Sequence, residues 1–196
     1  VGDATAAGWN TNNNNQALYR DASNTNKFYF TGKFGTSMFK LLEILGDNTW
    51  QPQWGLKGGV VANSDGGEPE PFTVSTAGYY TFEVDILAKT YSITPYSGAM
   101  TTYSSIDIAG NLNGWSGSTV LTQSSFDPHQ WFIKDLVVSS NGEAKFRANG
   151  TWDINWGAAA EFSGQGTQGG ANIPLNAGTY DVYFNDIDGR YVFVKK

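Results

Sequence analysis

The stretch Thr151-Trp152-Asp153-Ile154-Asn155-Trp156-Gly157 has a counterpart in the first half of the chain, Thr49-Trp50-Gln51-Pro52-Gln53-Trp54-Gly55. Both stretches read Thr-Trp, three intervening residues, then Trp-Gly, and both lie in polar, turn-rich sequence rather than in an apolar run. This context favours display of the tryptophans over their burial. A displayed indole offers a broad apolar face and one N–H donor. The repeated stretch therefore indicates a duplicated fold, and ligand-binding residues at the same place in each copy.

The repeat extends outward on both sides of this stretch. Upstream, Gly8-Trp9 matches Gly114-Trp115 and Lys40-Leu41 matches Lys145-Phe146. Downstream, the two ends of the halves align without a gap, from residues 77–93 to residues 177–193. Register over so many positions indicates two copies of one structural unit. The sequence predicts two domains, residues 1–97 and residues 98–196, joined by a small polar linker at 95–102.

Composition and patterning predict an all-β chain. The sequence has 24 glycines and 15% aromatic residues, a balance typical of short strands joined by many turns. Apolar and polar residues alternate in 27–31, 79–85 and 130–133, as expected for strands with one buried face. Asn141-Gly142 predicts a hairpin turn that joins 136–138 to 144–147. We expect two tandem antiparallel β-sandwich domains, similar to immunoglobulin or carbohydrate-binding modules.

Charge and motif content exclude several function classes. The net charge is −6 and the 12 Lys and Arg residues are scattered, whereas a nucleic-acid-binding protein needs a clustered basic surface. There is no cysteine for a disulfide or a thiolate metal site, and no phosphate-binding loop is present. The single histidine, His129, follows Asp127-Pro128 in a predicted turn, and Asp186 and Asp188 are expected to be surface carboxylates. We expect no catalytic residues, because no carboxylate pair recurs in both copies. We also expect no metal and no cofactor, because His129 has no partner motif and no nucleotide or calcium motif is present.

The candidate ligand-binding residues combine indoles with basic side chains. Because side chains alternate across a strand, Lys145 and Arg147 are expected to share an exposed face while Phe146 points inward. Flat aromatic surfaces suit the apolar face of a sugar ring, and ammonium or guanidinium groups can donate hydrogen bonds to its hydroxyls. The candidates are Trp115, Lys145, Arg147, Trp152 and Trp156 in the second copy, and Trp9, Lys40, Trp50 and Trp54 in the first.

Each candidate also has an ordinary structural interpretation. A tryptophan in a β-sandwich is often part of the core, and a basic residue often lies on a solvated sheet face. Of each Trp-x3-Trp pair we expect one residue to be structural, and Trp54 and Trp156 to be the better open platforms because each precedes a glycine. The first copy has Leu42 where the second has Arg147, so its site would depend on Lys40.

The residues that carry these signals also resemble a known family. Three stretches carry the resemblance: Gly2-Asp3-Ala4-Thr5 through Gly8-Trp9, the run from Lys145 to Gly157, and Ala-Gly-x-Tyr before each closing hairpin. Together they resemble the tandem starch-binding modules of the SusE and SusF outer-membrane lipoproteins of Bacteroidetes. The resemblance implies a non-catalytic protein at the cell surface, lipid-anchored through a missing N-terminal part, that binds starch or another α-glucan and works beside other glycan-uptake proteins. It implies that Trp115, Trp156 and Trp152 form an aromatic arc with Arg147 and Lys145 as donors, matched by Trp9, Trp54, Trp50 and Lys40.

Two alternatives stay open from the sequence. The chain could be a structural or adhesion protein whose tryptophans are core or interface residues. It could also be a fragment of a glycoside hydrolase, although its acidic residues fall in loops and hairpins.

Overall fold

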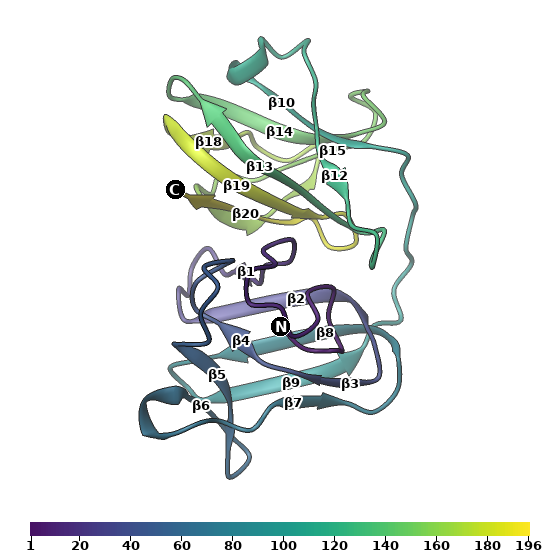
Figure 1. Cartoon of the computed structure of the whole chain (residues 1–196). Coiled ribbons are helices and arrows are strands. Elements are labelled where there is room, and N and C mark those ends of the chain that lie inside the picture. Colours follow the sequence, from purple (N-terminus) through teal and green to yellow (C-terminus); the bar gives the residue numbers. More distant parts are fainter. The chain divides into compact units, whose positions relative to one another are not determined.

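The computed structural model describes all 196 residues, and almost all of its regular structure is β-strand (Figure 1). The chain forms two compact units, one comprising Val1–Leu18 with Asn26–Gly98, the other Tyr19–Thr25 with Ala99–Lys196. The short strand β1 (Tyr19–Arg20) therefore belongs to the second unit, although it precedes most of the first in sequence. Independent folding of residues 1–97 and 98–196 stays a prediction.

The first unit is built from short antiparallel sheets. Its elements are β2 (Lys27–Phe34), β3 (Ser37–Phe39), β4 (Leu41–Leu42), β5 (Gln53–Lys57), β6 (Val60–Asn63), the 3-10 helix η1 (Ser64–Gly66), β7 (Phe72–Val74), β8 (Gly78–Asp85) and β9 (Thr90–Pro95). Strands β2, β8 and β9 hydrogen-bond in that order, β3 pairs with β7, and β4, β5 and β6 form a third sheet. The β8–β9 hairpin confirms the closing hairpin predicted for this half.

The second unit has two larger antiparallel sheets. Its elements are β10 (Ile106–Gly110), the 3-10 helix η2 (Asn111–Asn113), β11 (Thr119–Val120), β12 (Thr122–Gln123), β13 (Gln130–Val138), β14 (Gly142–Ala148), β15 (Asn155–Gly157), β16 (Ser163–Gln165), β17 (Thr167–Gln168), β18 (Ile173–Leu175), β19 (Gly178–Asn185) and β20 (Arg190–Lys195). One sheet has the order β11-β10-β14-β15-β17, with β18 also on β14, and the other β12-β13-β19-β20-β16. The all-β sandwich-type fold is confirmed.

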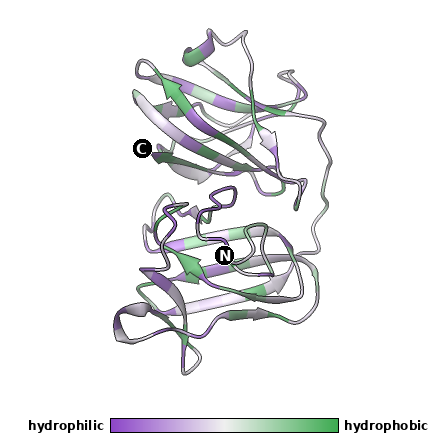
Figure 2. Cartoon of the chain, in the orientation of Figure 1, coloured by the Kyte–Doolittle hydropathy of each residue, from purple (hydrophilic) through white to green (hydrophobic).

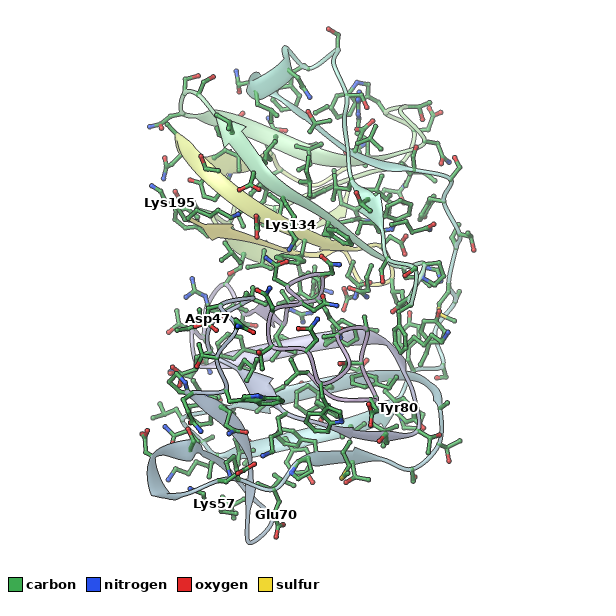
Figure 3. All side chains as sticks on the ribbon, viewed as in Figure 1. Asp47, Lys57, Glu70, Tyr80, Lys134 and Lys195 are labelled. Carbon is green, nitrogen blue, oxygen red and sulfur yellow. The ribbon has the colours of Figure 1, made fainter.

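Aromatic side chains fill the core of each unit. In the second unit Phe146 stacks on Phe184 with ring centroids 4.3 Å apart, and in the first Phe39 packs against Phe72 and Phe82 at 5.2 Å. Each fully buried ring of this size contributes about 2–3 kcal/mol through the hydrophobic effect. Hydrophobic residues alternate with hydrophilic ones along the strands (Figure 2), and side chains occupy the space within each unit (Figure 3).

The internal repeat is visible in strand register. Leu41 lies opposite Trp54 in the first unit, as Phe146 lies opposite Trp156 in the second. Gly55 and Gly157 occupy matching positions where a Cβ would lie 2.2 Å and 2.1 Å from a carbonyl oxygen, so each copy needs glycine there.

A tyrosine hydrogen bond also recurs in the two copies. The hydroxyl of Tyr80 donates to the carbonyl of Thr76 (2.8 Å), and that of Tyr180 donates to the carbonyl of Asn176 (3.0 Å); Tyr80 is labelled in Figure 3. Each bond reaches back four residues and fixes the corner that leads into the closing hairpin.

The hairpin predicted at Asn141-Gly142 is wrong. Strand β13 pairs with β12 and β19, whereas β14 pairs with β10, β15 and β18, so the chain crosses here from one sheet to the other. The dipeptide favours a tight turn, but strand pairing is decided by which faces bury apolar side chains. Instead of closing a hairpin, the Asn141 side chain accepts a hydrogen bond from the backbone N–H of Ala177 at 2.8 Å.

None of the helices has the length and the apolar composition that spanning a lipid bilayer requires.

Candidate functional site

In each unit the structure brings together two tryptophans that lie far apart in the sequence. The rings of Trp9 and Trp50 have centroids 6.0 Å apart and planes inclined by 36°. The rings of Trp115 and Trp152 have centroids 6.0 Å apart and planes inclined by 35°. Trp9, Trp50 and Trp152 are each about 40% exposed, and Trp115 is half-buried. The same tilted, solvent-facing indole pair is thus built twice.

Glycine-dependent turns place the first member of each pair. Gly8 and Gly114 have φ values of 55° and 69°, a left-handed conformation that glycine adopts without steric cost. In the second unit the turn follows η2 and Trp115 itself has φ 65°. The second members, Trp50 and Trp152, lie in the loop that precedes β5 or β15.

The expectation that Trp156 is an open platform is wrong. Trp156 is only 8% exposed and belongs to the core, with its ring centroid 5.2 Å from that of Phe184. Trp54 is half-buried, like Trp115, but it lies outside the indole pair and its Nε1 donates to Glu43 Oε1 at 2.8 Å. The second tryptophan of each Trp-x3-Trp stretch already lies in a strand, β5 or β15, where alternation turns its ring toward the opposite face from its neighbours.

The site of the first unit includes a surface hollow of about 600 Å³. Its lining includes the two indoles and Pro71 as apolar surface, with Lys40, Gln53 and Glu68 as polar groups. Lys40 is buried and does not lie on a solvent-exposed sheet face, and its Nζ lies 2.9 Å from Glu68 Oε1. The hydrogen bond from Lys40 lowers the pKa of the exposed Glu68 carboxyl, so Glu68 is ionised at neutral pH.

In the second unit the matching lysine has a different partner. Lys145 is half-buried, and its Nζ donates to Asn155 Oδ1 at 3.1 Å. Asn155 in turn donates through Nδ2 to the carbonyl of Trp152 at 2.8 Å. This chain of two hydrogen bonds ties the loop that carries Trp152 to strand β14.

The expectation that Arg147 lies exposed beside Lys145 is also wrong. Arg147 is 3% exposed and forms a two-point ion pair with the buried Asp107, Nε to Oδ1 at 2.8 Å and Nη2 to Oδ2 at 3.2 Å. The pairing of β10 with β14 sets Asp107 directly opposite Arg147, which compensates the guanidinium charge and lets it be buried. Its Cζ lies 4.5 Å from the ring centre of Trp152, so Arg147 supports an indole of the pair.

The sequence did not predict a buried polar cluster of His129, Trp131 and Asp186 in the second unit. His129 Nδ1 lies 2.6 Å from Asp186 Oδ1, and Trp131 Nε1 donates to Asp186 Oδ2 at 2.7 Å. Burial raises the pKa of Asp186 to about 6, partly opposed by these hydrogen bonds. Asp186 is 7% exposed, so its assignment as a surface carboxylate is wrong. Asp-Pro-His does form a turn, but no local pattern connects it to a residue so distant in sequence.

No family profile and no curated protein matches the chain. Among solved structures it is similar to the crystal structure of SusF from Bacteroides thetaiotaomicron, with a TM-score of 0.40 and 16% sequence identity over 97% of this chain and 46% of that one. The chain thus spans about half the length of that structure. A similarity of this strength does not show membership of a family, so function has to be assigned from the side chains of the two sites.

Proposed function

We propose that the protein is a non-catalytic glycan-binding protein in which each unit holds a polysaccharide, an α-glucan such as starch, on its tryptophan pair. The observation that supports this is the recurrence of one geometry: two indoles 6.0 Å apart and inclined by 36° or 35°. Indoles that served only stability would gain most by full burial. Both units instead keep these large apolar surfaces in contact with water.

The inclination of the rings favours a curved glycan. Consecutive glucose units of an α-1,4-linked chain turn relative to one another, so their apolar faces lie on a curved surface. Two indoles inclined by about 35° can each contact a different sugar of such a chain, whereas the flat ribbon of a β-1,4-glucan would meet only one of them fully. The pair therefore selects by shape before any hydroxyl is recognised.

The polar groups divide into ligand donors and supports. Lys40 and Lys145 lie at matching positions beside the indole pairs, and their ammonium groups can donate to sugar hydroxyls. Arg147, Trp54 and Trp156 are assigned to support of the platforms. This assignment keeps all nine residues inferred from the sequence in the two sites but gives these three an indirect role.

Two weak sites on one chain bind a long polymer more tightly than either alone, because the second contact is made at high local concentration. Such a protein would act at the cell surface, anchored in the outer membrane by a lipid on a preceding segment and working beside other glycan-uptake proteins. These parts of the proposal are supported only by the resemblance of the Gly2–Trp9 and Lys145–Gly157 sequences to the SusE and SusF modules.

Calorimetric titration with maltoheptaose tests the proposal, with cellohexaose as the flat-chain comparison. Trp50→Ala and Trp152→Ala should each abolish or weaken one site by about tenfold or more, the loss typical of a central aromatic contact. Leu87→Ala, an exposed apolar residue outside both pairs, is the control. Absence of heat with every glycan would contradict the proposal and favour a structural or adhesion role; release of reducing sugar would instead indicate a glycoside hydrolase.

A further inference from the structure

The hollow of the first unit contains a buried polar atom with no partner. Gln53 is 3% exposed, and its side-chain oxygen Oε1 makes no hydrogen bond. The backbone N–H of Gln53 donates to Ser64 Oγ at 3.3 Å, so the missing hydrogen bond is one to the side-chain oxygen. A buried acceptor without a donor is costly and rare in folded proteins.

In the second unit the side-chain oxygen at the position that matches Gln53 does have a hydrogen-bond donor. Gln53 lies opposite Leu42 in the β4–β5 pair, as Asn155 lies opposite Arg147 in the β14–β15 pair. The Asn155 oxygen accepts from Lys145 at 3.1 Å. In the first unit the equivalent Lys40 donates to Glu68 instead. Gln53 Oε1 is therefore left buried without a donor, on a residue that lines the hollow.

We propose that Gln53 is a specificity-determining residue of the first site, whose side-chain oxygen accepts a hydrogen bond from a hydroxyl of the sugar bound over Trp9 and Trp50. This inference rests on the proposed function. Glu68 contributes by holding the Lys40 ammonium away from Gln53, and a lysine ammonium has further protons to donate to a neighbouring hydroxyl. The first site thus presents the Gln53 acceptor beside the Lys40 donor, and this pair can recognise two hydroxyls of one sugar.

The test uses the full chain with the second platform removed by Trp152→Ala, so that only the first site reports. In this background Gln53→Met removes the acceptor while keeping side-chain length, and Gln53→Glu keeps an oxygen acceptor. Gln168→Met, on exposed strand β17, is the matched control. Maltoheptaose affinity and the urea midpoint of unfolding are measured for each protein.

We expect Gln53→Met to weaken maltoheptaose binding about tenfold, the change that corresponds to losing one good hydrogen bond. The same variant should unfold at an equal or higher urea concentration, because it removes an unsatisfied buried acceptor. Gln53→Glu should bind more tightly than Gln53→Met. Loss of affinity together with loss of stability would indicate a packing role and overturn the inference.

Two further outcomes separate this inference from the proposed function. If the Trp152→Ala background binds maltoheptaose and Gln53→Met binds it equally well, the acceptor role is overturned while glycan binding stands. If neither this background nor the unaltered chain binds any glycan, the proposed function and the inference both fall. A panel of maltosides lacking single ring hydroxyls identifies the hydroxyl: the analogue that lacks it should lose affinity for the Gln53 protein and not for Gln53→Met.

Discussion

Replacement of Arg147 by leucine, alone and together with Asp107→Leu, should separate the stability of the second unit from its ability to bind glycan. The change copies the residue found at the matching position of the first unit, Leu42. It removes both hydrogen bonds to Asp107, which is 1% exposed. Asp107 keeps the hydroxyl of Ser118, which donates at 2.6 Å, but it loses its compensating charge. Breaking a buried ion pair in this way costs about 3–5 kcal/mol of unfolding free energy.

The double variant Asp107→Leu with Arg147→Leu should recover most of that stability. It leaves no uncompensated charge, and buried ion pairs can often be replaced by apolar residues at little net cost. Binding should not recover, because the guanidinium no longer supports Trp152, a contact of about 0.5–2 kcal/mol. In a Trp50→Ala background we expect maltoheptaose affinity at the second site to fall by about two- to thirtyfold.

Urea unfolding followed by circular dichroism measures the first effect, and calorimetry with maltoheptaose measures the second. The near-ultraviolet signal of the Trp115–Trp152 pair should also change in both variants, since their rings lie 6.0 Å apart. A double variant that regains stability and also binds maltoheptaose as tightly as its Trp50→Ala parent would refute the positioning role of Arg147. A single variant that loses less than about 1 kcal/mol would refute the burial argument.

Three further predictions concern stability. The pKa of Asp186 in the folded chain, about 6, lies above its ordinary value of 3.8, so between these values the folded state keeps a proton that the unfolded state has lost. The protonated Asp186 therefore contributes its full stabilisation below about pH 4, and this contribution falls as the pH rises to 6. At 1.36 kcal/mol per pKa unit the fall amounts to about 3 kcal/mol of unfolding free energy. Urea midpoints measured from pH 4 to 7 should show this fall, and Asp186→Asn should remove it. Gly157→Ala and Gly55→Ala should each lower the free energy of unfolding by about 1–3 kcal/mol through overpacking, because the new Cβ would lie 2.1 Å or 2.2 Å from a carbonyl oxygen. An unchanged thermal unfolding midpoint would contradict this close approach. Residues 1–97 and 98–196 expressed separately should each unfold cooperatively, but 98–196 should be less stable than the same unit in the full chain because it lacks the buried Tyr19 side chain, whose hydroxyl donates to Gln130 Oε1 at 2.8 Å. Tyr19→Phe in the full chain should reproduce only the hydrogen-bond part of this loss, about 1 kcal/mol. Fragments without a transition would disprove the domain boundaries.

Sequence reasoning reached the fold class and the closing hairpins because both depend on local patterns. Alternation in residues 79–85 and turn residues before 91–94 are enough to specify β8 and β9. The gap-free match with residues 177–193 then carries the same hairpin to the second unit. The crossover after Asn141-Gly142 could not be predicted, because a turn dipeptide does not say whether the next strand joins the same sheet.

The sites were predicted less accurately because exposure depends on partners distant in sequence. The Trp-x3-Trp spacing identified the right loop, but the start of β15 decides that Trp152 faces solvent while Trp156 enters the core. The burial of Arg147 requires Asp107, which lies 40 residues earlier. Nothing near Arg147 in the sequence indicates this partner, whereas the strand pairing makes it evident.

Both copies have the same tryptophan pair, but the lysine beside it has a different hydrogen-bond partner in each, and in the first copy that partner is Glu68. In the second unit Lys145 donates to the side-chain oxygen of Asn155; in the first, Lys40 donates to Glu68 and leaves Gln53 Oε1 open. Glu68→Gln removes the charge that holds Lys40, so the ammonium should turn to Gln53 and reproduce the arrangement of the second unit. The acceptor is then occupied before the sugar arrives.

In a Trp152→Ala background, Glu68→Gln should therefore weaken maltoheptaose binding about as much as Gln53→Met does, that is about tenfold, and the two changes together should cost no more than either alone. A double-mutant cycle by calorimetry measures this coupling, and Glu70→Gln, an exposed acid in the same loop, is the control. Additive losses would mean that Glu68 and Gln53 act independently. The divergence of the two sites would then come from Leu42 and Arg147, and the lysine would play no part in it.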